Sequence, residues 1–232
     1  MELITALDFP DVASALAMVD SIGDACLWYK VGKQLFTSEG PQIVRALKER
    51  GKKVFLDLKY HDIPNTVAGA VRAAGCIGAD LCNVHASGGP AMLRAAAEAA
   101  RDAGIVCIAV TVLTSLDAEE LRAVGISASP AEQVERLARL TQESGLAGVV
   151  CSALELPVIR KVCGKDFLTV VPGIRPAGSS ADDQRRVMTP RMAAEAGADF
   201  IVVGRPITKA EDPRAVAIDI CCTGMITSSG NC

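Results

Sequence analysis

Eight short apolar runs recur along the 232 residues of this chain, and each precedes a segment with helical spacing of its apolar residues. We expect strands at residues 3–7, 27–31, 53–58, 80–85, 106–110, 148–151, 168–171 and 200–203. We expect helices at residues 11–21, 38–50, 66–74, 91–103, 131–144, 153–162 and 188–196, and a last one starting near residue 213. Strands that alternate with helices lie parallel in one sheet. Eight such units predict an α/β fold of one domain, the (β/α)₈ or TIM barrel.

Composition and charge narrow the possible functions. Half of the residues are hydrophobic but only 3% are aromatic, which suits parallel strands covered by alanine-rich helices. A net charge of −3 without a long basic run argues against a general nucleic-acid or membrane-surface role. The nine cysteines form no Cys-x-x-Cys pair, so we expect buried free thiols, with a metal or disulfide framework as the alternative. No signal peptide or bilayer-spanning run is visible, and we expect a cytoplasmic protein.

Charged side chains cluster at the end of the third predicted strand. Asp57 and Lys59 are two residues apart, so they face the same side of an extended chain, and Asp62 follows just past the strand. The first two strands end similarly, at Asp8 and Lys30. One explanation is a buried Asp57–Lys59 ion pair that only stabilises the barrel. The other is an active site, because such barrels place their chemistry at the carboxyl ends of strands and a charge network can hold a lysine ready for proton transfer.

Glycine and arginine follow each of the last two predicted strands. Gly204 and Arg205 come after the eighth strand, and Gly173 and Arg175 come after the seventh. Glycine permits close approach of the backbone, arginine offers a fork of donors, and barrels often bind phosphate at this place. We therefore expect a phosphate site, the alternative being two surface turns with solvated arginines.

The remaining polar residues give weaker signals. The connection at residues 172–187 is polar and rich in Gly and Pro, which predicts a lid with Gln184 as a polar contact. Thr114, after the fifth strand, is a candidate ligand contact or a simple cap. His61 and His85 lack metal-ligand spacing and are expected to be structural or part of a polar network. No Gly-x-Gly-x-x-Gly follows the first strand, which argues against dinucleotide binding, and no Ser-His-Asp pattern indicates a nucleophile.

Together these segments make the chain similar to a known family. It resembles the bacterial type of the orotidine 5′-phosphate decarboxylase family along nearly its whole length. Residues 57–66 read Asp-Leu-Lys-Tyr-His-Asp-Ile-Pro-Asn-Thr, a string far more specific to this family than the Asp-x-Lys-x-x-Asp core of the wider superfamily. The other matching segments are Ala6-Leu7-Asp8, Tyr29-Lys30-Val31-Gly32, Val84-His85-Ala86, Leu113-Thr114-Ser115, Val171-Pro172-Gly173-Ile174-Arg175, Asp182-Asp183-Gln184 and Val203-Gly204-Arg205-Pro206-Ile207.

The resemblance implies conversion of orotidine 5′-monophosphate into uridine 5′-monophosphate and CO₂, the last step of de novo pyrimidine synthesis, without a cofactor. It implies that Lys59 protonates C6 of the ring, that Asp57 lies beside the substrate carboxylate, and that Lys30 and Asp62 complete a charged relay. It also implies a homodimer in which Asp62 reaches into the partner's site. The implied substrate contacts are Asp8, Lys30, Asp57, Lys59, Asp62, Thr66, Thr114, Pro172, Arg175, Gln184, Gly204 and Arg205.

Two other functions stay open at this point. The Asp-x-Lys-x-x-Asp core also fits a Mg²⁺-dependent sugar-phosphate decarboxylase or aldolase, and the barrel can also be an inactive phosphate-binding protein with a regulatory role. Four charged residues at one mouth argue against the inactive protein. Residues 221–232 depart from the family pattern, so we expect a barrel domain at residues 1–220 followed by an atypical tail that can be disordered.

Overall fold

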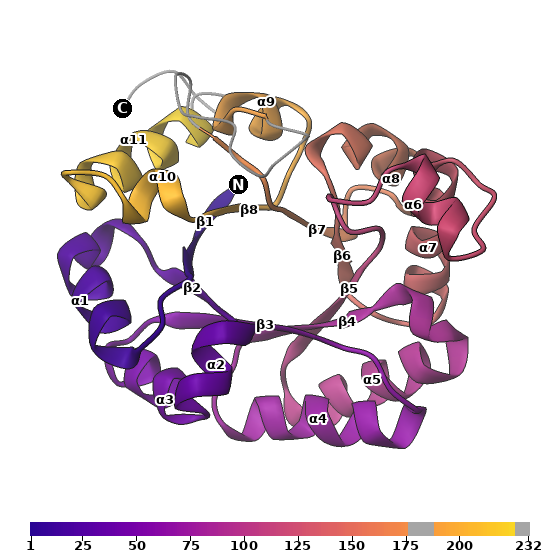
Figure 1. Cartoon of the computed structure of the whole chain (residues 1–232), viewed down its shortest axis with the longest axis horizontal. Coiled ribbons are helices and arrows are strands. Elements are labelled where there is room, and N and C mark those ends of the chain that lie inside the picture. Colours follow the sequence, from indigo (N-terminus) through magenta and orange to yellow (C-terminus); the bar gives the residue numbers. More distant parts are fainter. Residues whose placement is uncertain (176–187, 226–232) are drawn as a thin grey trace.

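The computed structural model describes residues 1–175 and 188–225, and these form a closed barrel of parallel strands surrounded by helices (Figure 1). Each strand pairs with the next along the chain, and the last pairs with the first. The strands are β1 Glu2–Leu7, β2 Trp28–Gly32, β3 Lys53–Tyr60, β4 Leu81–His85, β5 Val106–Val110, β6 Gly148–Val150, β7 Leu168–Val171 and β8 Phe200–Val203. The predicted (β/α)₈ barrel is confirmed, and the expected strands agree with these to within one or two residues at each end.

Helices cover the outside of the ring of strands (Figure 1). The α-helices are α1 Val12–Ile22, α2 Lys33–Glu39, α3 Gln42–Glu49, α4 Pro64–Cys76, α5 Gly89–Ala103, α6 Ala118–Ala123, α7 Pro130–Glu143, α8 Leu156–Cys163, α9 Pro190–Glu195, α10 Arg205–Thr208 and α11 Pro213–Met225. Short 3₁₀ turns are η1 Gly23–Ala25, η2 Ala86–Gly88 and η3 Ala153–Glu155. Among the described residues, no helix is both long enough and apolar enough to cross a membrane.

Two helical regions differ from the sequence prediction. The single helix expected at residues 38–50 is wrong, because α2 and α3 divide at Gly40, whose φ is 62°, and at Pro41, which has no backbone donor. Helix α6 was not predicted; it lies between the strand predicted at residues 106–110 and the helix predicted at residues 131–144. Its start is fixed by a capping box in which Asp117 and Glu120 each accept a hydrogen bond from the other residue's backbone N–H.

The last helix, α11, extends beyond the point where the sequence departs from the family pattern. It runs continuously from Pro213 to Met225 and therefore includes the first part of the segment expected to be an atypical tail. Residues 226–232 lie outside the described part of the chain.

Apolar side chains form two layers, one on each face of the curved sheet. The larger cluster lies between the strands and the helices and includes Leu3 and Leu7, whereas the alternate residues Ile4 and Ala6 point into the barrel. The interior cluster consists of Ile4, Ala6, Trp28, Phe55, Leu81, Ile108, Val170 and Val202. Burial of each large aliphatic side chain stabilises the fold by about 1.5–3 kcal/mol. These side chains fill the barrel below its mouth and leave the carboxyl ends of the strands for polar residues.

No disulfide joins the eight cysteines in the described part of the chain. Five of them, Cys26, Cys82, Cys107, Cys151 and Cys163, are buried. Burial raises the pKa of Cys151 and of Cys26, so both thiols stay protonated at neutral pH. The expectation of buried free thiols is confirmed for these residues.

Gly148, the first residue of β6, has no room for a side chain. A Cβ atom there would lie 2.1 Å from the carbonyl oxygen and 2.6 Å from the Cβ atom of Leu168 on β7. We expect Gly148→Ala to lower the free energy of unfolding by about 3 kcal/mol, because β6 and β7 must move apart. The exposed Gly69 in α4 has open space around it, so the control Gly69→Ala should raise stability by about 0.5–1 kcal/mol. Urea denaturation measures both, and an unchanged stability of Gly148→Ala would contradict this packing.

Candidate active site

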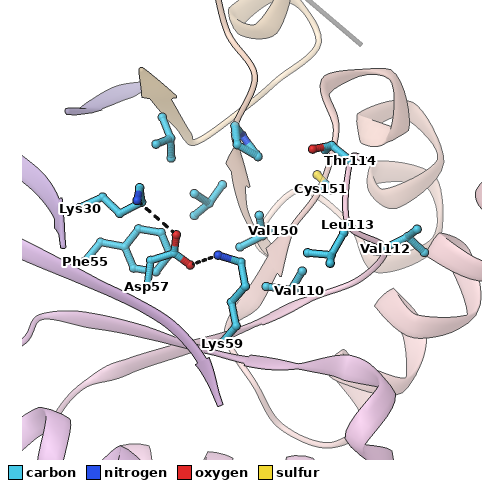
Figure 2. Close-up of a pocket in the computed structure, with 13 residues that line it drawn as sticks. Lys30, Phe55, Asp57, Lys59, Val110, Val112, Leu113, Thr114, Val150 and Cys151 are labelled. Carbon is cyan, nitrogen blue, oxygen red and sulfur yellow. Dashed lines mark hydrogen bonds and ion pairs between the residues drawn. The ribbon is translucent and has the colours of Figure 1, made fainter. Parts of the chain in front are cut away.

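Three adjacent strands bring a network of alternating charges to the barrel mouth. Asp8 directly follows β1, Lys30 lies on β2, and Asp57 and Lys59 lie on β3. The ammonium nitrogen of Lys59 is 2.6 Å from Oδ1 of Asp57, and that of Lys30 is 3.5 Å from Oδ2. Lys30 also lies 3.1 Å from Oδ1 of Asp8. Figure 2 shows the Asp57 carboxylate between the two ammonium groups. With Asp8, four residues singled out from the sequence meet here.

Burial and neighbouring charges shift the pKa values of Asp57 and Lys30 in opposite directions, and the neighbouring charges have the larger combined effect. Asp57 is only 9% exposed, which opposes its charged form, but the two ammonium groups beside it outweigh burial and hold its pKa below the usual value. Burial also opposes the charged form of Lys30, yet the carboxylates of Asp57 and Asp8 hold the pKa of Lys30 above its usual value. Asp57 and Lys30 are therefore both charged at neutral pH.

The backbone at Lys59 leaves the extended conformation that the sequence predicts. Its φ is 55°, and no other non-glycine residue in the described part of the chain has a positive φ. This conformation costs about 1–2 kcal/mol for an ordinary residue. The pairing of β3 with β4 shifts register between Leu56 and Tyr60, so Lys59 lies in an irregular stretch of the ladder. Asp57 and Lys59 lie together as alternation indicated, but the strand predicted to end at residue 58 continues to Tyr60 with an irregular stretch that includes Lys59.

Asn83 on β4 is a site residue that sequence reasoning missed. Its side-chain oxygen accepts a hydrogen bond from the backbone N–H of Lys59 at 2.8 Å, and its amide nitrogen donates to Oδ1 of Asp57 at 2.7 Å. The signal available in the sequence was one amide side chain inside the apolar strand of residues 81–85. A buried polar group in such a place needs partners, and these two were not identifiable from one sequence.

A cavity of about 170 Å³ opens beside the charge network (Figure 2). Lys30, Asp57 and Lys59 line its charged side. The other lining residues are mostly apolar: Phe55, Val110, Val112, Leu113, Thr114, Val150, Cys151, Val170, Pro172 and Val202. Thr114 and Pro172 were both expected to contact a ligand. A charged wall facing an apolar wall suits a flat ring with polar edges whose reacting atom lies near an ammonium group.

A second cavity of about 170 Å³ adjoins the first, and the two share Lys30, Pro172 and Val202. Its other lining residues are Ala6, Asp8, Gly173, Ile174, Arg175, Gly204, Arg205 and Pro206. The structure thus brings both Gly–Arg turns to one place. Arg175 is only 6% exposed, unlike a solvated surface arginine. Two guanidinium groups and two glycines around one hollow are suited to an anion such as phosphate.

Two described residues with expected roles, Asp62 and Thr66, do not join these cavities. Asp62 and Thr66 line neither cavity, and both are exposed at the start of α4 or just before it. The carboxylate of Asp62 accepts a hydrogen bond from the backbone N–H of Ile63 at 2.6 Å. Gln184 lies outside the described residues.

The two histidines lie next to each other near Lys59, with ring centroids 5.6 Å apart. Burial, and then the neighbouring His61, lower the pKa of His85. Within residues 1–175 and 188–225, no group of three or more His, Cys, Asp or Glu side chains is arranged to hold a metal ion.

A closed parallel barrel whose mouth carries a buried lysine–aspartate network and two joined cavities defines an enzyme of the (β/α)₈ class. The family model described as "Orotidine 5'-phosphate decarboxylase / HUMPS family" matches residues 1–220. The chain therefore belongs to this family.

Curated relatives and a solved structure agree with this assignment. The orotidine 5′-phosphate decarboxylase of Pectobacterium atrosepticum is 54% identical over 222 residues, which cover 94% of this chain and 90% of that protein. The enzyme of the same name from Chromohalobacter salexigens is 56% identical over 220 residues, covering 94% and 93%. A crystal structure of orotidine 5′-phosphate decarboxylase from Lactobacillus acidophilus superimposes with a TM-score of 0.87 at 39% identity, over 96% of this chain and 98% of that one.

Replacing the central carboxylate tests the charge network. Asp57→Asn keeps the shape but leaves two ammonium groups without the charge between them, so we expect stability to fall by about 2–3 kcal/mol at pH 7. The lowered pKa of Asp57 means that its contribution is present above its unfolded value, near 4, and is lost as the pH falls through the folded value. The raised pKa of Lys30 means that its contribution is present below its unfolded value, about 10, and is lost as the pH rises through the folded value.

The difference in Tm between the wild type and Asp57→Asn should therefore be largest between about pH 5 and 9 and shrink on either side. Thermal unfolding followed by circular dichroism across this range measures it. A difference that does not change with pH would contradict the network.

Proposed function

We propose that this chain decarboxylates orotidine 5′-monophosphate to uridine 5′-monophosphate and CO₂, the last step of pyrimidine nucleotide synthesis. One observation carries this proposal: Asp57 holds the Lys59 ammonium group at 2.6 Å on the wall of a ring-sized cavity. The adjoining cavity, lined by Arg175 and Arg205, lies where a phosphate joined to the ring through a sugar would reach. Relatives at 54% and 56% identity are named for this reaction.

The reaction needs a cation held beside one carbon atom. When the bond from C6 to the carboxylate breaks, CO₂ leaves and the bonding electron pair stays on C6. The ammonium group of Lys59 stabilises this pair and then transfers a proton to C6, which completes the product, and the neutral amine takes up a proton from solvent. Asp57 keeps the ammonium group in place, and its negative charge beside the substrate carboxylate disfavours the bound ground state.

The second cavity binds the phosphate in this proposal. Arg175 and Arg205 donate to the phosphate oxygens, and Gly204 lets the backbone come close. Lys30 lines both cavities, and Asp8, 3.1 Å from it, lines the second, so the two are in reach of the ribose that would connect ring and phosphate. Phosphate binding far from C6 supplies energy that orders the site around the ring. The remaining proposed substrate contacts are Thr114, Pro172 and Gln184.

Turnover of orotidine 5′-monophosphate by the purified protein tests the function, and Lys59→Ala tests the mechanism. We expect the wild type to consume the substrate and Lys59→Ala to lower kcat by about 1,000-fold or more, because the variant lacks both the stabilising cation and the proton donor. The decrease of substrate absorbance measures the rate. Lys161→Ala, at an exposed lysine of α8, is the matched control and should keep wild-type kcat.

Two outcomes would contradict the proposal. A wild type without turnover would refute the substrate assignment, and an undiminished rate in Lys59→Ala would refute the role of this lysine. The same assay in the presence of a metal chelator tests the superfamily alternative. We expect full activity with the chelator, whereas loss of activity that Mg²⁺ restores would favour a metal-dependent sugar-phosphate enzyme.

We further propose a homodimer in which each chain completes the other's site. Asp62 and Thr66 line no cavity of their own chain, although both lie in the segment that follows the charged strand end. Ile63, beside Asp62, is 68% exposed, and a large apolar side chain at such a place is typical of a surface that another chain covers. In the proposed dimer Asp62 enters the partner's first cavity, and Thr66 contacts the ribose there.

Mixing two inactive variants tests this sharing of sites. Lys59→Ala and Asp62→Ala homodimers should each be nearly inactive. After the two are unfolded together and refolded as an equal mixture, half of the dimers are mixed, and each mixed dimer has one intact site. Activity should therefore return to about one quarter of the wild-type value per chain. No recovery in a mixture shown to contain mixed dimers would place Asp62 in its own chain's site.

We propose that this reaction takes place in the cytoplasm. Five cysteines are buried thiols outside any disulfide, which suits a reducing compartment: Cys26, Cys82, Cys107, Cys151 and Cys163.

A further inference from the structure

Asn83 is the one amide side chain inside strand β4, and it is completely buried. Its neighbours Cys82 and Val84 belong to the outer apolar layer, and Leu81 belongs to the interior cluster. The alternation of the strand therefore directs Asn83 into the barrel, one layer above Leu81 and level with the charged residues of β3. A buried amide in this place destabilises the fold unless its polar atoms are paired.

The two hydrogen bonds of Asn83 fix its orientation. A backbone N–H can only donate and a carboxylate can only accept, so the oxygen of Asn83 must face Lys59 and its nitrogen must face Asp57. The oxygen of Asp57 that accepts from Asn83 is the same Oδ1 that lies 2.6 Å from the Lys59 ammonium group. One side chain thus holds both the backbone of the proposed proton donor and the carboxylate that orients its ammonium group.

Because the backbone of β3 is irregular, the hydrogen bond from Lys59 to Asn83 also fixes the conformation of the strand. Regular pairing with β4 is interrupted between Leu56 and Tyr60, so Lys59 lies where the regular ladder is broken. The backbone N–H of Lys59 donates to the side-chain oxygen of Asn83 and not to a backbone carbonyl of the regular ladder. Lys59 has a φ of 55°, and this angle sets the direction in which its Cα–Cβ bond leaves the chain. A change at Asn83 would release the backbone that aims the ammonium group.

We propose that Asn83 is a positioning residue for decarboxylation, which holds the Lys59 backbone in its left-handed conformation and fixes Asp57 against the same ammonium group. This inference rests on the proposed function. A change at Asn83 should affect kcat, because the position of Lys59 matters most when charge develops on C6. It should affect substrate binding little, because Asn83 lines neither cavity.

Asn83→Ala and a destabilising control separate positioning from general stability. Thr169 on β7 is also completely buried, and its hydroxyl bonds Asp199 and Arg160 near the opposite end of the barrel. We expect Asn83→Ala to lower kcat by about 30- to 100-fold with KM changed by less than about threefold. Thr169→Val should lower Tm but leave both kcat and KM unchanged at temperatures well below Tm. Equal kcat values for Asn83→Ala and the wild type, or a change in KM alone, would overturn the inference.

The pH dependence of kcat in Asn83→Asp is a second measurement, which should not change if Asn83 only stabilises the fold. The variant keeps the size of the side chain but puts an oxygen where the amide donated to Asp57, so the two carboxyl groups can approach only with a shared proton. The charged and titratable groups nearby are Asp57 and Lys59 from β3, Lys30 from β2, Asp8 after β1, His85 from β4 and His61 beside it, while β5 presents Ile108 and Val110.

The ratio of kcat in Asn83→Asp to kcat in the wild type should fall by about tenfold or more between pH 5.5 and pH 8.5, as the shared proton is lost. Dividing by the wild-type value at each pH removes the titration of His85 and other groups common to both proteins. A ratio that does not vary with pH, in a variant with a native circular dichroism spectrum, would overturn the inference. An inactive wild type would instead refute the proposed function and this role together.

Discussion

A single buried carboxylate, that of Asp57, keeps two ammonium groups together at the mouth of this barrel. Without it, Lys30 and Lys59 would repel each other in a place where water cannot screen them fully. With it, each lysine has a fixed counter-charge, and Lys59 is directed toward the cavity wall. The irregular pairing of β3 with β4, the left-handed conformation of Lys59 and the amide of Asn83 all contribute to this arrangement.

The opposite end of the barrel supplies the stability that such a mouth needs. Trp28 and Phe200 meet edge to face at 5.3 Å where β2 and β8 begin, and the Trp28 indole donates to Glu2. Nearby, Arg160 and Thr169 share the carboxylate of Asp199. Packing and satisfied hydrogen bonds at this end offset a strained residue and buried charges at the other. The barrel thereby separates the part that holds the fold together from the part that binds and reacts.

The sequence predicted the strands well, because apolar runs of a parallel sheet are short, continuous and bounded by glycines. It also located Asp57 and Lys59, since charges at the end of a buried strand stand out against their neighbours. It did not predict the conformation of Lys59 or the role of Asn83, because both depend on the register of β3 against β4, a contact between segments far apart in the chain. The sequence also did not show that Asp62 lines neither cavity of its own chain, because this depends on how the segment after β3 folds.

The second cavity lies between the first and the last strand of the barrel. Asp8 follows the first strand and Arg205 follows the last, and they meet because β8 pairs with β1. Residues that follow the first strand and residues that follow the last strand must therefore both be in place before this cavity can form. A ligand in this cavity contacts both sides of the seam where the barrel closes. A ligand bound in this cavity should therefore stabilise the closed barrel relative to any partly opened form.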